Sequence, residues 1–187
     1  MKGTKVFIAG SRRLSQLNLD VRRRIDTIVH KGFTVVVGDA NGVDKAVQKY
    51  LASKHYTDVI VFCMEGSCRN NLGDWPTRTI SAADPERKDF AYYSTKDRAM
   101  AAEADYGLML WDGHSRGTLT NVVHLVRQGK PVVVYIASRK SFQTLRQPSQ
   151  LLQIMTHFDK EALHRIDSEL QAVETATDPG RKVHTRA

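Results

Sequence analysis

Cysteine is scarce in this sequence, and long hydrophobic runs are missing from it. Only Cys63 and Cys68 occur among 187 residues, which is too few for a small domain that depends on disulfides. A chain of this length buries roughly 70% of its unfolded surface and needs no disulfide or metal to stabilise its core. No apolar run approaches the ~18 residues of a membrane-spanning helix, and no charged-then-apolar leader opens the chain. These absences predict a cytoplasmic protein in a reducing compartment.

Patterns for metal sites and for nucleophilic catalysis are also missing. The histidines are scattered, and Cys63 and Cys68 have no partnering His or Cys pair, so we expect no metal and no cofactor. Ser11 has no nearby histidine in a nucleophile-elbow pattern, which argues against acyl transfer. Cys68 precedes Arg69, a cation that could favour a thiolate, although such a segment is more often a polar loop.

Positive charge exceeds negative charge, and the excess is concentrated near the N-terminus. The formal net charge is +8, and residues 1–31 hold eight Lys or Arg against two acidic residues. This basic stretch suits an anionic partner, and a nucleotide phosphate is as good a candidate as DNA. A basic surface without a binding role is the simpler alternative. With 41% hydrophobic and 26% charged residues, the chain has the composition of a globular protein rather than a disordered one.

Short β-branched runs alternate with helical patterns along most of the chain. Each run is continuously apolar, as expected of a strand that is buried on both faces. The runs are residues 5–10, 33–37, 58–63, 106–111 and 132–136. Apolar residues at spacings of three and four predict helices over residues 21–29, 43–51, 95–104 and 117–128. Because strand–helix–strand connections produce parallel strands, we predict an α/β, three-layer Rossmann-like fold with a five-stranded parallel sheet.

The composition divides the chain into three parts. Residues 1–137 form the predicted Rossmann-like domain, which a polar insertion over about residues 65–93 interrupts. Residues 138–177 form a C-terminal helical extension, and residues 178–187 form a flexible tail. The extension contains an amphipathic helix marked by Leu163, Ile166, Leu170 and Val173. This helix either folds back on the domain or pairs with a second copy, and we expect a homodimer.

Glycine and polar residues follow three of the predicted strands, at the edge where open parallel sheets bind ligands. Glycine lets a ligand approach the backbone, hydroxyls and arginine bind phosphate, and carboxylates bind sugar hydroxyls or act as general acids and bases. The candidate ligand-binding residues are Gly10, Ser11, Arg12, Gly38, Asp39, Asn41, Gly42, Asp44, Gly113, Ser115, Gly117 and Thr118. The spacing after the second predicted strand matches neither a GxGxxG motif nor a P-loop, and each group also has a simpler explanation as a turn or helix cap.

Three segments carry a family resemblance, namely FIAGSR, VVVGDANGVDKAV, and KDRAMAAEADYGLMLWDGHSRGTLTNVV followed by GKPVVVY. Over most of residues 4–136 the chain resembles the SLOG superfamily of Rossmann-like nucleotide-binding proteins. That grouping includes the Lonely-guy phosphoribohydrolases, the DNA-processing protein A core and YspA-like proteins. Nucleoside 2-deoxyribosyltransferases are more distantly similar. The resemblance implies that residues 1–137 bind a nucleotide.

Two positions depart from the pattern of the Lonely-guy phosphoribohydrolases. Their motif Gly-Gly-x-Gly-Thr-x-x-Glu ends in a glutamate that acts on the glycosidic bond, and this glutamate falls on Asn121, which cannot be a carboxylate base or nucleophile. Their arginine falls on Lys96, which keeps the charge but loses the bidentate fork. Both residues are candidate ligand-binding residues by this resemblance. A hydrolase of this kind would need another carboxylate, and the catalytic candidates are Asp97, Asp112 and Asp39 in that order.

The leading functional hypothesis is a protein that binds a nucleoside phosphate or an NAD- or ADP-ribose-type molecule. Phosphate would bind to Ser11, Arg12, Gly117 and Thr118, the sugar to Asp39, Asp44 and Asp112. The insertion would act as a lid, and Tyr92-Tyr93-Ser94 is either a lip on which the base stacks or buried packing. If chemistry occurs, we expect cleavage or transfer at the N-glycosidic bond, with an aspartate stabilising the oxocarbenium charge.

Two alternatives belong to other functional classes. The first is a non-catalytic nucleotide sensor, which the replacements at Asn121 and Lys96 favour. The second is nucleic-acid binding, suggested by the DNA-processing relatives and by arginines near the N-terminus. These arginines are Arg12, Arg13, Arg22, Arg23 and Arg24. Nucleic acid is the less favoured partner, because the sequence shows no clear aromatic and basic track outside the N-terminal third.

Overall fold

The computed structural model describes residues 3–82 and 90–154, which form strands and helices in alternation. The elements are β1 (Lys5–Gly10), α1 (Leu19–His30), β2 (Thr34–Gly38), α2 (Val43–Ser53), β3 (Val59–Met64), β4 (Thr77–Ile80), α3 (Phe90–Glu103), β5 (Tyr106–Trp111), α4 (Arg116–Arg127), β6 (Val132–Ile136), β7 (Ser141–Leu145), the 3-10 turn η1 (Pro148–Gln150) and α5 (Leu151–Ile154). The predicted α/β, Rossmann-like architecture is confirmed, since all five predicted strands and the helices between them are present.

The sheet has seven strands rather than the five that the sequence predicts. Their order is β4-β3-β2-β1-β5-β6-β7, and every pairing is parallel except the antiparallel pair β6–β7. Both unpredicted strands lie at edges of the sheet. β4 has the sequence TRTI and is mostly exposed, and β7 has the sequence SFQTL, so neither contains a continuous apolar run. An edge strand has one neighbour and an accessible side, which removes the apolar pattern that identifies central strands.

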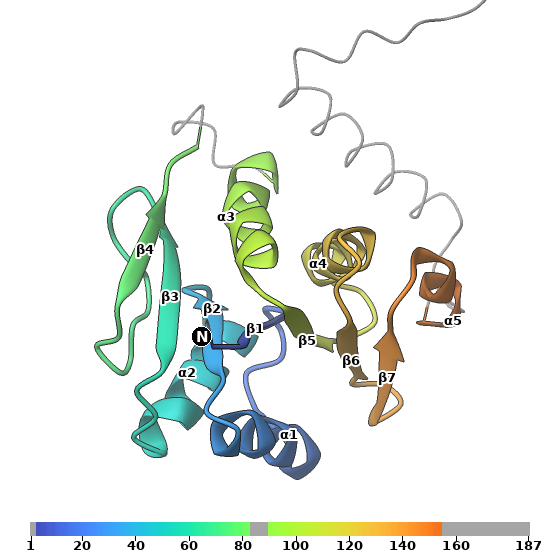
Figure 1. Ribbon diagram of the computed structural model, residues 1–187, viewed down its shortest axis with the longest axis horizontal. Helices are drawn as coiled ribbons and strands as arrows, with labels where there is room; N and C mark the ends of the chain where they lie inside the picture. Colours follow the sequence, from blue (N-terminus) through green and yellow to red (C-terminus); the bar gives the residue numbers. More distant parts are fainter. Residues whose placement is uncertain (1–2, 83–89, 155–187) are drawn as a thin grey trace, which may run out of the picture. The chain divides into compact units, whose positions relative to one another are not determined.

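Helices cover both faces of the sheet. Figure 1 shows α1 and α2 on one face and α3 and α4 on the other. Val21 and Ile25 of α1 and Val47 of α2 pack with Ile8 and Val37 of the sheet in one hydrophobic cluster. The alternate strand residues, such as Phe7, Val36 and Met109, point to the opposite face and are also fully buried. Because both faces are buried, the central strands need apolar side chains at every position, which explains their continuous runs.

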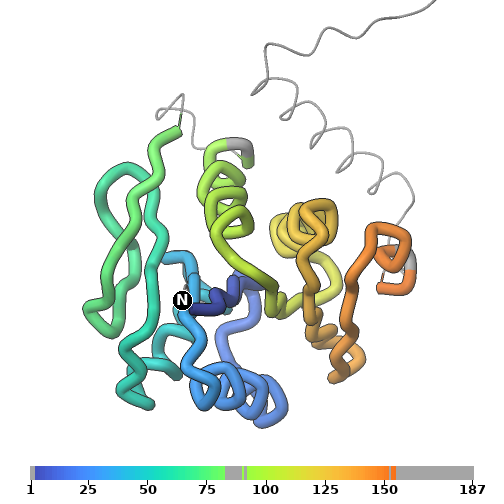
Figure 2. Tube along the Cα trace, in the orientation of Figure 1, coloured from blue at the N-terminus to red at the C-terminus, as the bar shows by residue number. Residues whose placement is uncertain are grey.

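The order of the strands in the sheet changes direction at β1. Strands β2, β3 and β4 follow one another on one side of β1, and β5 lies on its other side. Ile8 of β1 is therefore paired with both Val37 of β2 and Leu108 of β5. Figure 2 shows the N-terminal strand in dark blue beside this much later segment. The loops that leave β1 and β5 therefore diverge at the carboxyl ends of the strands, which is where open α/β sheets bind ligands.

The structure differs from the sequence-based predictions at the cysteines and at the predicted domain boundaries. Cys63 and Cys68 form a disulfide that joins the end of β3 to the following loop, so the expected free thiols, and with them the thiolate suggested at Cys68, are absent. The predicted insertion contains β4, and β7 follows the proposed boundary at residue 137. A compact unit spans Met1–Ile154. The amphipathic helix around Leu163 and the tail from residue 178 lie outside the described residues. None of the described helices is long and apolar enough to cross a membrane.

The approach of β1 to β5 and α2 generates a prediction about Gly10. A Cβ atom at this position would overlap the carbonyl oxygen of Leu110 and would lie 2.7 Å from Cγ2 of Val43. We expect Gly10→Ala to lower the free energy of unfolding by about 1–3 kcal/mol, because the backbone of β5 cannot yield without loss of sheet pairing. Urea-induced unfolding followed by circular dichroism measures this change. Gly117→Ala is the matched control, since a Cβ there meets nothing within 4 Å, and an equal loss in both variants would contradict the packing argument.

Candidate functional site

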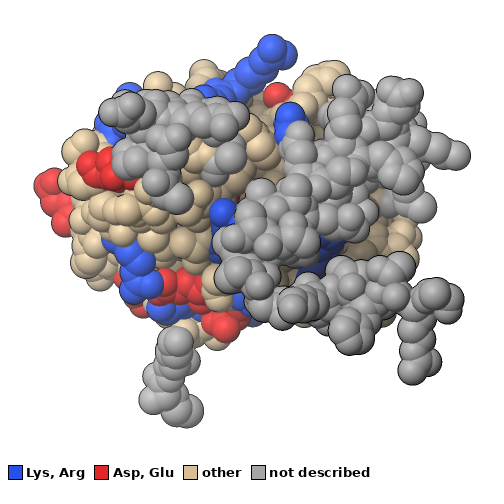
Figure 3. Space-filling model, turned by 90° about the horizontal axis from the view of Figure 1, so that it is seen from above, with Lys and Arg blue, Asp and Glu red and all other residues tan. Residues whose placement is uncertain are grey.

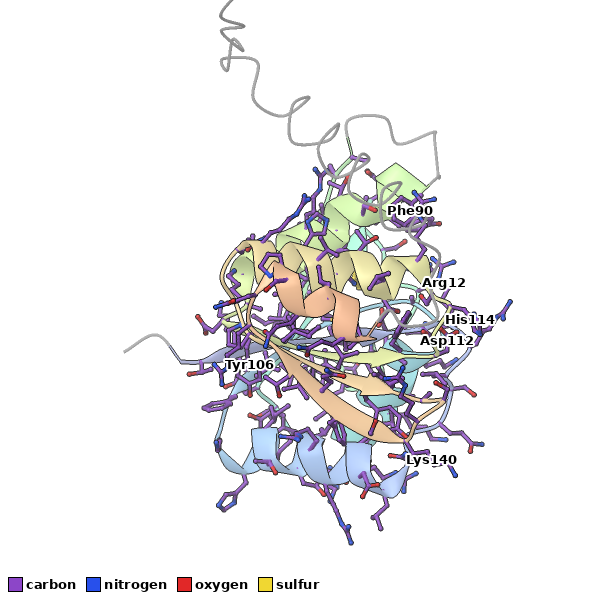
Figure 4. All side chains as sticks on the ribbon, turned by 90° about the vertical axis from the view of Figure 1, so that its right-hand side faces the viewer. Arg12, Phe90, Tyr106, Asp112, His114 and Lys140 are labelled. Carbon is purple, nitrogen blue, oxygen red and sulfur yellow. A yellow bond between two sulfur atoms is a disulfide. The ribbon has the colours of Figure 1, made fainter. Side chains whose placement is uncertain are left out.

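A cavity of about 550 Å³ opens at the carboxyl ends of the central strands. Figure 4 shows Arg12, Asp112 and His114 together at this end of the sheet, whereas Tyr106, the first residue of β5, lies at the opposite end. Of the residues that the sequence predicts for the site, those lining the cavity are Gly10, Arg12, Asp44, Lys96, Asp97, Asp112, Ser115, Gly117, Thr118 and Asn121. The structure therefore brings together residues from the ends of β1 and β5 and from α2, α3 and α4.

The N-terminus of α4 faces this cavity and is built from hydroxyl-bearing residues. Ser115 is the N-cap, and its Oγ accepts hydrogen bonds from the backbone N–H of Thr118 at 3.3 Å and from its hydroxyl at 2.9 Å. The Oγ of Ser11 lies 3.4 Å from the Thr118 hydroxyl, although Ser11 itself is fully buried. Gly117 leaves the first turn open on the cavity side. A helix N-terminus with an open first turn favours an anion, because its free N–H groups and dipole are positive.

Asp112 organises the loop between β5 and α4. Its Oδ1 accepts hydrogen bonds from the backbone N–H groups of His114 at 2.9 Å and Ser115 at 2.7 Å, and its own N–H donates to Ser11 Oγ at 3.1 Å. Desolvation raises the pKa of Asp112, but these hydrogen bonds outweigh it and hold the pKa below its usual value. Asp112 is therefore ionised at neutral pH and committed to the loop backbone.

Asp39, at the end of β2, lies at the centre of a buried ion cluster. Its Oδ1 is 2.5 Å from Nζ of Lys96 and 2.8 Å from Nη2 of Arg69. Its Oδ2 accepts from Nε of Arg69 at 3.1 Å and from the Arg69 backbone N–H at 3.0 Å. Desolvation raises the pKa of Asp39, but the hydrogen bonds and charges of Arg69 and Lys96 hold it well below the usual range. Both oxygens are occupied, so Asp39 is fully engaged with protein groups.

The segment that carries Arg69 is fixed to β2 and α2 by amide side chains. Nδ2 of Asn70 donates to the backbone oxygen of Asp39 at 2.8 Å and to Oδ1 of Asn41 at 3.2 Å. Nε2 of the fully buried Gln48 donates to the carbonyls of Gly38 at 2.8 Å and Asn70 at 3.1 Å. The loop after β3 is thereby held against the carboxyl end of β2, which keeps Arg69 at the cavity.

Two further carboxyls, Asp44 and Asp97, lie close to Lys96. Desolvation raises the pKa of Asp44 to about 7, with the charge of Asp97 adding to the effect and Lys96 opposing it. Desolvation also raises the pKa of Asp97, while Lys96 and a hydrogen bond from the side chain of Asn121 oppose the rise. One lysine thus faces three carboxyls, of which Asp39 holds the negative charge and the other two favour the protonated form. A carboxyl with a raised pKa keeps its proton to a higher pH than a free aspartic acid does, so it is better suited to act as a general acid.

Aromatic and arginine side chains form the rim of the cavity. The ring of Tyr93 has two guanidinium groups near it, with the carbon of Arg12 at 5.3 Å and that of Arg69 at 5.4 Å from the ring centroid. Phe90 has the guanidinium of Arg116 at 4.2 Å from its centroid. The structure shows no salt bridge from Arg12 to a carboxylate among the described residues. The rim is therefore positively charged and carries flat surfaces suited to a ring-shaped group.

The remaining predicted residues support the site without lining the cavity. Gly42 has a φ of 83°, and a Cβ there would overlap the backbone of Arg12, so this glycine lets α2 approach the loop after β1. Gly38 lies beneath the side chains of Asp44 and Lys96. Gly113 has a φ of 89° in the loop that Asp112 organises. At the start of α2, the backbone N–H of Val43 donates to the carbonyl of Ser11 at 3.4 Å.

Sequence reasoning missed Arg69, Phe90, Arg116 and His114 as cavity residues. Arg69 reaches the cavity from a loop about thirty residues after Asp39, and no local pattern links the two. The signal that could have identified it is an arginine flanked by asparagines within a segment that follows a predicted strand. Among the described residues, no group of three or more His, Cys, Asp or Glu side chains is arranged to hold a metal ion.

The arginines of α1 do not join those at the cavity. Arg22 lies over the ring of Tyr50, Arg24 lies over Phe142, and Arg23 pairs with Asp20 at 3.6 Å. On the face above α3 and α4, basic side chains of the described surface stand in separate groups among acidic and uncharged ones (Figure 3). The arginines near the N-terminus are therefore divided between two places. Arg12 and Arg13 line the cavity, whereas Arg22, Arg23 and Arg24 lie on α1.

Comparisons with known proteins identify a similar fold. A solved structure of DNA processing protein A from Helicobacter pylori superposes with a TM-score of 0.55, covering 90% of this chain and 81% of that one. The chain therefore has a fold similar to that of DNA processing protein A. The two sequences are 17% identical, so the likeness to DNA processing protein A concerns the fold. That structure was determined to explain how DNA processing protein A binds single-stranded DNA. No family model matches the chain, and no curated protein matches it in sequence.

The buried ion cluster generates a stability prediction for Asp39. Asp39→Ala leaves the charge of Lys96, a residue only 3% exposed, without its partner and frees Arg69. We expect a loss of about 3 kcal/mol or more in the free energy of unfolding, because an unpaired buried charge is costly. Chemical denaturation measures the loss. Asp20→Asn, which removes an exposed pair with Arg23, is the control and should leave stability nearly unchanged.

Asp44 generates a prediction on pH. Its pKa is about 7 in the folded protein against 3.8 in the unfolded chain, so between these values the folded state binds the additional proton. Asp44 therefore lowers the free energy of unfolding as the pH rises from 4 to 7, by a total on the order of 3 kcal/mol. Asp44→Asn should gain stability relative to the wild type over this window, as measured by urea unfolding at a series of pH values. A stability difference independent of pH would contradict the assignment.

Proposed function

We propose that the cavity binds a nucleotide through its phosphate group. The observation that carries this proposal is the pairing of an open helix N-terminus, at Ser115 to Thr118, with the guanidinium of Arg12 at the same cavity. A phosphate would accept hydrogen bonds from the first turn of α4 and from Arg12, both of which suit a dianion. The aromatic rings of Tyr93 and Phe90 at the rim would accommodate the base.

The bound nucleotide can be part of a single-stranded nucleic acid or a free molecule, and a different observation favours each alternative. A single-stranded nucleic acid is favoured by the structural neighbour, whose description concerns single-stranded DNA binding, and by arginines next to aromatic rings at the rim. A free nucleotide is favoured by the buried carboxyls on the floor of the cavity, since a strand backbone makes little use of them. The comparison with DNA processing protein A gives more support to the nucleic acid than to the free nucleotide.

Chemistry at the N-glycosidic bond is a further proposal that depends on one carboxyl. Of the three catalytic candidates, Asp39 is enclosed by Arg69 and Lys96, and Asp112 is bonded to the loop backbone. Asp97 lines the cavity and has a raised pKa, so it is the candidate able to donate a proton to a leaving base. A nucleotide sensor without catalytic activity would use the same binding residues. For the enzyme and for the sensor alike, the homodimer remains a prediction.

The binding proposal is tested by calorimetric titration of ribonucleoside 5′-monophosphates and of the same nucleosides without phosphate. We expect the monophosphates to bind and the nucleosides to bind at least about 10-fold more weakly, because charge-assisted hydrogen bonds to phosphate supply much of the affinity. Arg12→Gln should weaken the monophosphates by about 10-fold. Arg23→Gln, an exposed change on α1, is the matched control and should leave binding unaltered.

Three outcomes separate the alternatives. A fluorescent oligothymidylate that binds more tightly than any mononucleotide, with an affinity that falls steeply as salt rises, would favour the strand. Chromatographic detection of free base after incubation with nucleotides, NAD or ADP-ribose, abolished by Asp97→Asn, would make the protein an N-glycosidase or transferase. Equal affinity for nucleosides and their monophosphates would contradict phosphate recognition.

A further inference from the structure

A buried hydrogen-bond acceptor on the cavity wall has no partner in the described part of the chain. The side chain of Asn121 is 4% exposed, and its Oδ1 accepts no hydrogen bond from the described residues. Asn121 lines the cavity, one turn of α4 beyond Thr118. A buried carbonyl oxygen without a donor is unfavourable, so this position carries a stability cost that a bound group can remove.

The neighbouring carboxyl fixes how the amide is oriented. The side chain of Asn121 hydrogen-bonds to Asp97, an interaction that favours the charged carboxylate, so the amide Nδ2 is the donor. Nδ2 therefore points to Asp97, and Oδ1 is the atom that remains without a partner. Asp97 thus positions Asn121 as an acceptor, and a ligand that satisfies it must supply a hydrogen-bond donor.

The position along α4 indicates which donor this is. Thr118 and Asn121 are three residues apart, which places them on the same side of the helix and ~4.5 Å apart along its axis. A phosphate at the first turn would therefore be followed, one turn deeper, by the group attached to it. In a nucleoside 5′-phosphate that group is the sugar, and its hydroxyls are the donors. The base would extend to the aromatic rim, away from this acceptor.

We infer that Asn121 Oδ1 accepts a hydrogen bond from a ribose hydroxyl, with Asp97 as the positioning residue, and that the site selects hydroxylated over deoxygenated sugars. This inference rests on the proposed function, because it takes the phosphate at the N-terminus of α4 as its reference point. It moves sugar recognition from Asp39, Asp44 and Asp112, where we expected it from the sequence, to the facing surfaces of α3 and α4.

The experiment compares ribonucleoside 5′-monophosphates of all four bases with their 2′-deoxy and 3′-deoxy counterparts, by calorimetric titration against the full chain. We expect at least one deoxygenated series to bind about 10- to 100-fold more weakly, since a site built to bond a hydroxyl is left with an unpaired acceptor when the hydroxyl is missing. In Asn121→Leu this ratio should fall to near 1, through weaker binding of the ribonucleotide.

Matched variants separate recognition from a general effect on folding. His124→Leu changes the next residue on this side of α4. His124 is also buried and does not line the cavity, and its Nε2 has no hydrogen-bond partner within residues 3–82 and 90–154. This substitution should preserve the ratio between ribose and deoxyribose ligands. Asn121→Ser, whose hydroxyl is too short to replace the amide, provides a second test if the leucine variant fails to fold, and it should reduce the ratio in the same way.

The possible outcomes distinguish ribose recognition by Asn121 from the proposed binding of a nucleotide phosphate. Equal binding of the ribose and both deoxyribose series by the wild type overturns the inference and leaves phosphate binding intact. A ratio that persists in both Asn121 variants also overturns it. Failure of every nucleotide to bind, at concentrations up to the millimolar range, refutes the proposed function and the inference with it.

Discussion

The ion cluster around Asp39 is the interaction on which the rest of the site depends. One carboxylate joins the end of β2, Lys96 on α3 and Arg69 on the loop after β3. These segments are far apart in sequence, and two of them form the wall and the rim of the cavity. Burying any one of these charges without a partner would cost free energy, and the pairing of the charges offsets that cost. The cluster therefore specifies one arrangement of the three segments. Burial raises the pKa values of the neighbouring carboxyls Asp44 and Asp97, and the charge of Lys96 opposes this rise in both.

The central strands of this fold could be predicted from the sequence, because both of their faces are covered by helices and their buried positions are therefore apolar. The runs at residues 5–10, 33–37 and 106–111 are continuously apolar, and the helices between them show matching stripes. β4 and β7 could not be found in this way, since each has one neighbour and carries polar side chains. Their strand conformation is imposed by the pairing of Thr77 with Val61 and of Leu145 with Val132, which is a tertiary effect.

The location of the site followed from the sequence more readily than the roles of its residues. Parallel strands place their following loops at one edge, so Arg12, Asp112 and Thr118 were expected to be close together. The role of Asp39 depends on its neighbours in space. It was expected to bind a ligand, but Arg69 and Lys96 occupy its oxygens. Spacing along the chain cannot reveal such pairings, because they arise between segments that meet only after folding.

The disulfide between Cys63 and Cys68 gives the rim a covalent attachment in addition to its ionic one. It closes a loop that ends immediately before Arg69, so this residue is tethered to the end of β3 whatever the charge of Asp39. A short closed loop has few conformations available to it, which limits how far its neighbour can move. Loss of the ion pair alone would free the Arg69 guanidinium, whereas the disulfide would still hold the preceding residue at the end of β3. The rim therefore combines a covalent attachment beside the Arg69 backbone with an ionic attachment of the Arg69 side chain.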